Sequence, residues 1–133
     1  MNGPAQLARV DLADATVARL AGEFDASNAG WVAEELRAMM ADAAGRRLIL
    51  DLSRVTFLDS STVSLVLGMK EECRRSNTAF ALTAPDDSRA ARVLDLTGVG
   101  SVIPLTATIG EAITRLSEDG DTEDGDQPSS VRP

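Results

Sequence analysis

Residues 48–70 read LILDLSRVTFLDSSTVSLVLGMK, and this stretch decides the fold. It opens with the apolar run 48–52, broken only by Asp51, which is typical of a central strand covered on both faces. Over 61–75 the apolar residues recur with the spacing of an amphipathic helix. A buried strand that leads shortly into a helix is the repeating unit of an α/β fold.

Hydroxyl groups stand where this helix is predicted to begin. Ser60 and Ser61 follow Asp59 directly. A helix start has unpaired backbone N–H groups and a partial positive charge, so it accepts oxygen ligands and anions. Two interpretations are open at this point. One of the serines caps the helix, or one of them accepts a phosphate that controls binding.

A helical wheel divides the predicted helix into two faces. One stripe is expected to be buried and holds Thr62, Val66, Met69 and Cys73. Cys73 is therefore predicted to be a core thiol. The opposite face carries small and charged residues, which suit close approach and orientation of a second protein; they are Ser64, Gly68, Glu71, Glu72 and Arg75.

Strand and helix patterns alternate along the rest of the chain, which predicts an α/β sheet. The first helix follows start signals at Asp25 to Asn28, and Gly45 is expected to end it. A Thr108 to Glu111 capping box opens the last helix, expected to run to about Leu116. The predicted strands are 6–10, 16–21, 79–83 and 102–105 besides 48–52, and a short helix runs from Asp87 or Ser88 to Leu94.

The length of 133 residues indicates one domain, and the net charge of −8 opposes nonspecific binding to nucleic acid. The charge is concentrated in the tail 117–133, which has one base and little apolar surface. We expect a domain at 1–116 and a disordered acidic tail at 117–133. No apolar run suits a membrane span and no signal peptide is visible, so a cytoplasmic location without membrane insertion is expected. The acids of the tail are Glu118, Asp119, Asp121, Glu123, Asp124 and Asp126.

Several kinds of enzyme are disfavoured by the residue inventory. The chain has no histidine and one cysteine, which argues against a Ser-His-Asp triad and against a zinc site. No Gly-rich phosphate loop is present, and the sole lysine, Lys70, does not suit a receiver domain that accepts phosphate on an aspartate. We therefore predict no catalytic residues, no metal and no cofactor.

The motif residues resemble those of the STAS domain, and within it the bacterial anti-sigma factor antagonists. The shared pattern is a hydrophobic strand, an Asp-Leu-Ser-like exit as at 51–53, and Asp-Ser-Ser-Gly opening a helix, read here as Asp59-Ser60-Ser61 with Thr62 in place of glycine. Further matches are Gly22-Glu23-Phe24-Asp25, Gly68 and Leu94-Asp95-Leu96-Thr97-Gly98-Val99. The resemblance covers roughly residues 5 to 116.

The resemblance implies a single STAS-like domain with a mixed four- to five-stranded sheet and about four helices. It also implies an unphosphorylated form that captures an anti-sigma factor with serine kinase activity and so frees a sigma factor. The kinase would phosphorylate Ser61, with Ser60 as the alternative, and a metal-dependent serine phosphatase would reset it. Asp25, Asp59 and Thr62 would surround the phosphosite. The partner-binding residues would be Ser64, Gly68 and Glu72.

A different function stays open on the same fold. The chain could be a STAS scaffold without a phosphorylation switch, or an accessory subunit in a signalling or membrane-transport assembly. Thr62 keeps this alternative open, because a β-branched residue in place of glycine adds bulk beside the serines.

Overall fold

The computed structural model describes residues 4–43 and 46–126, and within them five strands form one mixed sheet in the order β1-β2-β3-β4-β5. The first two strands are antiparallel and the remaining pairs are parallel. This arrangement confirms the predicted α/β class. The strands are β1 (Gln6–Asp11), β2 (Thr16–Phe24), β3 (Arg47–Leu58), β4 (Ala79–Thr83) and β5 (Leu105–Thr106).

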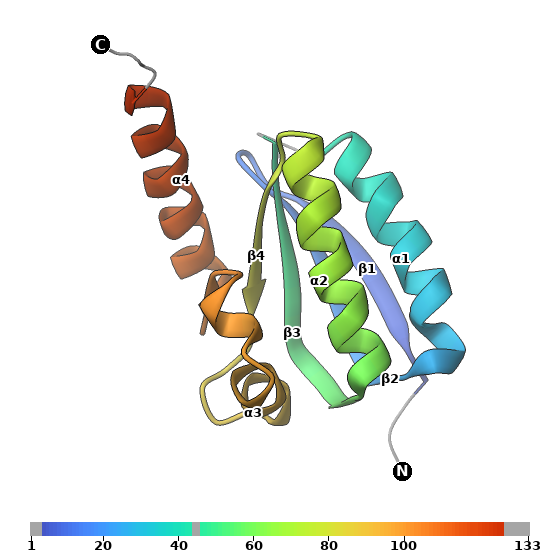
Figure 1. Cartoon of the computed structure of the whole chain (residues 1–133). Coiled ribbons are helices and arrows are strands. Elements are labelled where there is room, and N and C mark those ends of the chain that lie inside the picture. The colour runs from blue at the N-terminus through green and yellow to red at the C-terminus, as the bar shows by residue number, and fades with distance from the viewer. Residues whose placement is uncertain (1–3, 44–45, 127–133) are drawn as a thin grey trace.

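Each parallel connection passes through a helix, as the geometry of parallel strands requires. Figure 1 shows α1 and α2 side by side over the sheet, while α4 stands apart at the other end of the strand order. The short α3 and a 3₁₀ turn, η2, lie between β4 and β5. The helices are α1 (Ala26–Ala41), α2 (Ser60–Arg75), α3 (Arg89–Leu96) and α4 (Ile109–Asp126), and η2 spans Val99–Ser101.

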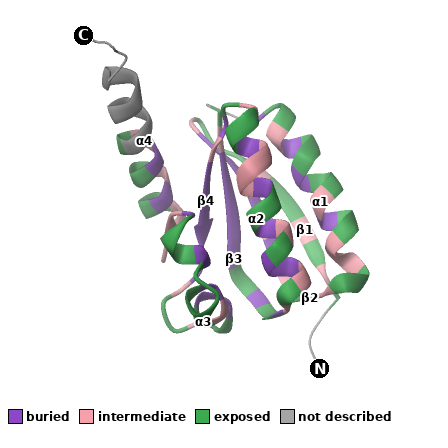
Figure 2. Cartoon of the chain, viewed as in Figure 1, coloured by how far each residue is buried: buried purple, intermediate pink, exposed green. Residues whose placement is uncertain are grey.

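The central strand β3 separates two apolar cores. Leu48, Leu50 and Leu52 lie in the larger core with the inner faces of α1, α2 and α3. Ile49 lies in the smaller core, which includes Ala112 and Leu116 of α4. Figure 2 shows β3 and β4 buried along most of their length. Both faces of the strand are covered, which explains why its sequence is a continuous apolar run.

β3 is longer than the sequence predicted. It continues past Leu52 to Leu58, because Val55 and Leu58 still reach the larger core. The spacing of these two residues breaks the strict alternation of a strand, and the pairing of β2 with β3 shifts register nearby. A register shift of this kind bends a strand and hides the period-two signal.

The last strand differs from the prediction of 102–105. β5 contains only Leu105 and Thr106, and Val102 is 51% exposed. Ile103 is buried in the larger core instead of extending a ladder. Pro104 has no N–H to donate, but its carbonyl oxygen accepts the N–H of Leu82 at 2.8 Å. Regular pairing therefore begins only after the proline.

The last helix begins as predicted. Thr108 Oγ1 accepts the N–H of Glu111 at 3.1 Å, and the Glu111 carboxylate accepts the N–H of Ala107 at 3.2 Å. The backbone of α4 then continues to Asp126, beyond the expected end near Leu116, since no proline interrupts it and a helical glycine costs only about 1 kcal/mol. Residues 127–133 of the predicted acidic tail, and Gly45, lie outside the described residues.

The prediction for Cys73 is confirmed. Its side chain is 1% exposed and belongs to the larger core, beside Met69. Burial, together with the nearby charge of Glu72, raises the pKa of the thiol to about 11. Cys73 is therefore a packing residue and not a reactive thiol.

Candidate functional site

Two aspartates leave the sheet at the same edge. Phe24 at the end of β2 pairs with Leu58 at the end of β3, and Asp25 and Asp59 follow them directly. Each aspartate caps the helix that comes next, Asp25 for α1 and Asp59 for α2. The structure thus places Asp25 at the strand end next to the motif, as the sequence predicted.

Asp59 caps α2. Its Oδ1 atom accepts the N–H of Ser61 at 2.9 Å and the N–H of Thr62 at 3.3 Å. The interpretation that Ser60 or Ser61 caps the helix is therefore wrong, because the preceding aspartate already satisfies those donors. Neither serine hydroxyl has a hydrogen-bond partner among the residues that the structure describes. Both remain available for chemistry.

The two serines differ in exposure. Ser60 is exposed, whereas Ser61 is half-buried in the first turn of α2. A phosphate on Ser61 would lie near the positive helix start, which favours an anion, and near the Asp59 carboxylate, which repels it. The hydroxyl and the backbone N–H of Ser27 donate to the Asp25 carboxylate and hold its pKa below the ordinary value, so Asp25 also contributes negative charge at this edge. The site would therefore gain charge in a region that is already partly negative.

Thr62 faces inward and not toward a partner. It is 3% exposed, and its Oγ1 atom is buried without a hydrogen-bond partner among the described residues. The Thr62 side chain, which stands where the family pattern has glycine, therefore lies in the core. It adds no bulk to the outer surface of the motif. The helical wheel had already placed Thr62 in the buried stripe, and this part of the prediction is confirmed.

Replacing Thr62 with valine should raise the free energy of unfolding by about 1 kcal/mol. A buried hydroxyl without a partner carries a desolvation cost of about 1–3 kcal/mol, which Thr62→Val removes at nearly constant shape. The matched control is Thr83→Val, since the Thr83 hydroxyl donates to Asp51 at 3.0 Å and its loss should destabilise. Urea unfolding measures both changes. A clear loss of stability in Thr62→Val would contradict the unpaired hydroxyl.

Replacing Asp59 with alanine should lower the free energy of unfolding by about 1 kcal/mol, because α2 loses its N-cap. Ser60→Ala is the control: Ser60 is exposed and caps nothing, so its replacement should change stability by less than about 0.5 kcal/mol. Chemical denaturation of the two variants makes the comparison. Equal effects would show that Asp59 is not the functional cap.

The outer face of α2 runs away from Ser61. Ser64 and Gly68 are exposed, as predicted. An added Cβ at Gly68 would meet no atom within 4 Å, so the surface there is open. Glu72 is less available than expected, because its carboxylate pairs with Arg37 Nε of α1 at 2.9 Å. Leu67 on this face was not predicted, although it is 40% exposed. It could have been found from the sequence as an apolar residue outside the buried stripe of the helix.

Comparison with known proteins assigns the family. The family model described as STAS domain matches residues 7–112. The chain belongs to the STAS domain family. This STAS chain is 28% identical over 101 residues to the anti-sigma-F factor antagonist RsfA of Mycobacterium tuberculosis, covering 75% of this chain and 78% of RsfA.

Two structural relatives extend the comparison. An anti-sigma factor antagonist from Mycobacterium paratuberculosis is 25% identical with a TM-score of 0.76, over 86% of this STAS chain and 95% of that one. The anti-sigma factor antagonist SpoIIAA in its unphosphorylated form is 28% identical with a TM-score of 0.66, over 86% and 97%. SpoIIAA of Bacillus in the phosphorylated form is 29% identical with a TM-score of 0.60, over 85% of this STAS chain and 99% of that one.

Two further kinds of feature, a cluster of metal ligands and a membrane-spanning helix, were sought in the described part of the STAS chain. Among the side chains that the structure describes, those of residues 4–43 and 46–118, no three or more acidic, cysteine or histidine side chains gather as metal ligands would. None of the helices described there has the length and apolar character needed to span a bilayer.

Proposed function

We propose that this STAS protein is an anti-sigma factor antagonist of the cytoplasm. Its unphosphorylated form binds an anti-sigma factor that has serine kinase activity, and this capture frees a sigma factor. The protein itself is a binding module and not a catalyst. The support comes from the relatives compared above, which are anti-sigma factor antagonists by name, and from the agreement of their fold with this one.

The observation that carries the proposal is the free hydroxyl of Ser61 at the start of α2. Because Asp59 caps the helix, the Ser61 hydroxyl makes no hydrogen bond within the described residues, so phosphorylation would break none there. Phosphorylation adds about −1.5 to −2 charges and three acceptor oxygens. The fold can keep its shape while the surface gains a strong negative charge, which is what a switch of binding requires. Ser60 remains the alternative acceptor.

The same geometry favours exclusion of the partner. A partner seated on Ser61 and on the outer face of α2 would bury the phosphate beside Asp59. A buried charge without a partner costs several kcal/mol. The kinase would therefore release its product, and a metal-dependent serine phosphatase would restore the binding form. That SpoIIAA has been solved in a phosphorylated form is consistent with this cycle.

The function is tested by reconstitution. Purified chain is added to a preformed complex of a sigma factor with an anti-sigma factor from the same organism, and free sigma factor is measured by size-exclusion chromatography. We expect release of the sigma factor and a new complex that contains this chain. If none of the anti-sigma factors of that organism binds the unphosphorylated chain, the proposal is wrong.

Replacing Gly68 with leucine should separate stability from binding. The exposed helix gains about 1 kcal/mol of stability when glycine is replaced by leucine, and the open space at Gly68 accommodates the side chain. A partner that packs against α2 would meet this side chain, so its affinity should fall at least about tenfold, which is 1.4 kcal/mol. Isothermal titration calorimetry and thermal unfolding measure the two effects.

Gly30→Leu is the matched control for this variant. Gly30 is also exposed and helical, in α1, and an added Cβ there meets nothing within 4 Å. We expect the same gain in stability with no change in affinity. A Gly68→Leu protein that binds as tightly as Gly30→Leu would exclude the outer face of α2 from the interface.

A further inference from the structure

Two arginines on α3 stand out among the charged residues. The guanidinium groups of Arg89 and Arg92 have no ion-pair or hydrogen-bond partner in the described part of the chain, and both residues are exposed. Most other arginines are engaged, for example Arg19 with Asp51, Arg37 with Glu72 and Arg74 with Glu71. In a chain of net charge −8, two neighbouring cations without an internal partner can pair with an acidic ligand.

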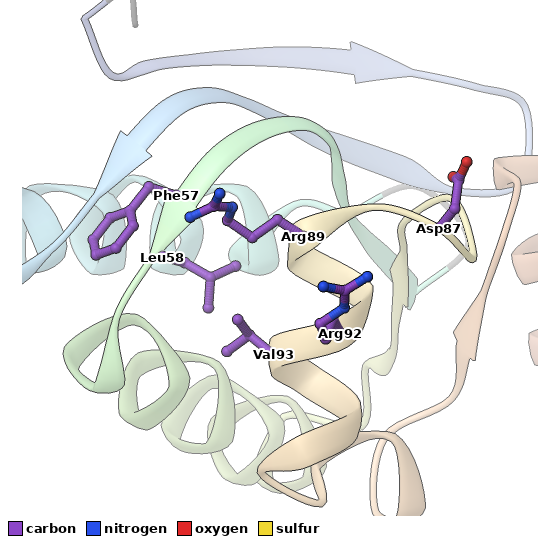
Figure 3. A pocket seen from close by; sticks show the side chains of 6 residues that line it. All are labelled: Phe57, Leu58, Asp87, Arg89, Arg92 and Val93. Atoms are coloured by element: carbon purple, nitrogen blue, oxygen red, sulfur yellow. The ribbon is translucent and has the colours of Figure 1, made fainter.

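These arginines line one cavity of about 430 Å³. Its apolar part comes from Phe57 and Leu58 at the end of β3 and from Val93 of α3. Figure 3 shows Arg89 reaching toward Phe57, with Leu58 and Val93 pointing toward each other below it. Asp87 also contributes to the lining, but its carboxylate lies beyond Arg92, away from Phe57 (Figure 3). The cavity therefore combines an apolar end with a cationic wall.

The exposure of Phe57 is the second observation. Its side chain is 39% exposed, although a phenyl ring next to a core strand is more stable when covered. Aromatic residues at the centre of an interface are frequent anchors for binding. Leu58, which is buried, directly precedes the Asp59 cap, so the cavity borders the segment that leads into α2.

We propose that this cavity is a docking site for an acidic segment of a partner protein. Carboxylates of the segment pair with Arg89 and Arg92, and an apolar side chain beside them covers Phe57. Guanidinium groups bind carboxylates in a bidentate manner, which fixes the orientation of the segment. A free inorganic anion would satisfy the arginines but would leave the phenyl ring of Phe57 uncovered, so the two-part lining favours a peptide.

The two arginines also add selectivity. An acidic partner is attracted where α3 presents Arg89 and Arg92, and pairing with both fixes its orientation. Ser61 does not line this docking site, which takes its charge from α3. The proposal goes beyond the antagonist function, and its test involves neither Ser61 nor an anti-sigma factor, so the two can fail independently.

The test is an NMR titration of the ¹⁵N-labelled full chain. The probes are a short peptide that alternates glutamate with leucine, the same peptide with glutamine in place of glutamate, inorganic phosphate, and ATP. We expect the acidic peptide to shift the amide signals of Phe57, Leu58, Arg89 and Val93. We also expect the shifts to weaken with added salt, because exposed charges are screened.

Two variants decide the role of the arginines. The double variant Arg89→Gln with Arg92→Gln should weaken peptide binding at least about tenfold, or 1.4 kcal/mol, while its thermal unfolding stays as in the parent. Arg54→Gln is the matched control, since Arg54 is an exposed arginine of β3 that lines a different cavity, beside Trp31, and it should bind the peptide normally.

Three outcomes would overturn the docking site. The glutamine peptide could shift the same signals equally, which would exclude charge recognition. Phosphate or ATP could bind there at least as well as the acidic peptide, which would make it a small-anion site. Finally, if none of the probes shifts the signals of α3 and of the end of β3, a binding site at this cavity is excluded.

Discussion

Replacing Ser61 with glutamate should weaken binding to the anti-sigma factor by at least about a hundredfold. The carboxylate places a permanent negative charge where the proposed interface is closed, next to the Asp59 carboxylate that caps α2. A desolvated charge without a partner costs about 3 kcal/mol or more, which corresponds to about two orders of magnitude in affinity. Calorimetric titration against the purified anti-sigma factor measures the loss.

The stability of the Ser61→Glu protein should not fall with its affinity. A glutamate in the first turn of a helix interacts favourably with the helix dipole. Ser60→Glu is the matched control, because Ser60 is exposed and adjacent, and its affinity should stay within about threefold, or 0.7 kcal/mol. A large loss in Ser60→Glu with none in Ser61→Glu would move the phosphosite to Ser60. Unchanged binding in both variants would contradict a charge switch at this helix start.

Replacing Asp51 with alanine should lower the free energy of unfolding by about 3 kcal/mol. Asp51 is 4% exposed in the middle of β3. Its carboxylate accepts the Arg19 Nε donor at 3.1 Å, the Thr83 hydroxyl at 3.0 Å and the Ser53 N–H at 3.0 Å. The buried Thr83 hydroxyl loses its acceptor in the variant, which costs about 1–3 kcal/mol. The more exposed Arg19 and Ser53 donors lose their bonds to the carboxylate at a smaller cost, because water can replace it.

Urea unfolding of Asp51→Ala checks this value against a surface control. Glu71 pairs with Arg74 at 2.6 Å on the outside of α2, and Glu71→Ala should cost less than about 1 kcal/mol, as exposed ion pairs do. If Asp51→Ala is no more damaging than Glu71→Ala, the hydrogen bonds of Asp51 do not contribute to the fold.

Asp51 also gives a pH dependence of defined sign. Burial alone raises the pKa of Asp51, but the donors of Ser53, Thr83 and Arg19 outweigh burial and hold the pKa below its ordinary value of 3.8. A lowered pKa contributes stability that is complete above the ordinary value and is lost as the pH falls through the folded-state value. The advantage of the parent over Asp51→Asn should therefore be constant near neutral pH and shrink in acid below about pH 4.

The order of strands and helices was predictable because it rests on local signals. The apolar run 48–52, the start signals at Asp25 to Asn28 and the Thr108 capping box each indicate a local structure, and packing stabilises it in the fold. The end of β3 and the start of β5 were not predictable in this way. They depend on a register shift against β2 and on the burial of Ile103, which are decided by tertiary contacts.

The candidate site was predictable in part for the same reason. Its position at a helix start followed from the motif, but the choice of Asp59 as the cap depends on the backbone geometry before α2. The pair Glu72 and Arg37 joins residues of two helices, and the cavity of Phe57 and Arg89 joins a strand to a distant helix. A single sequence contains no local signal for such long-range pairs.

The most direct test of the switch is phosphosite mapping by mass spectrometry. The chain and its Ser61→Ala variant are incubated with ATP and a lysate of the native cells. A second protein that kinases of that lysate phosphorylate serves as the positive control. We expect a single phosphate on Ser61 that is absent from the variant. An unmodified chain in a lysate whose kinases are active, or a phosphate on neither Ser61 nor Ser60, would contradict it.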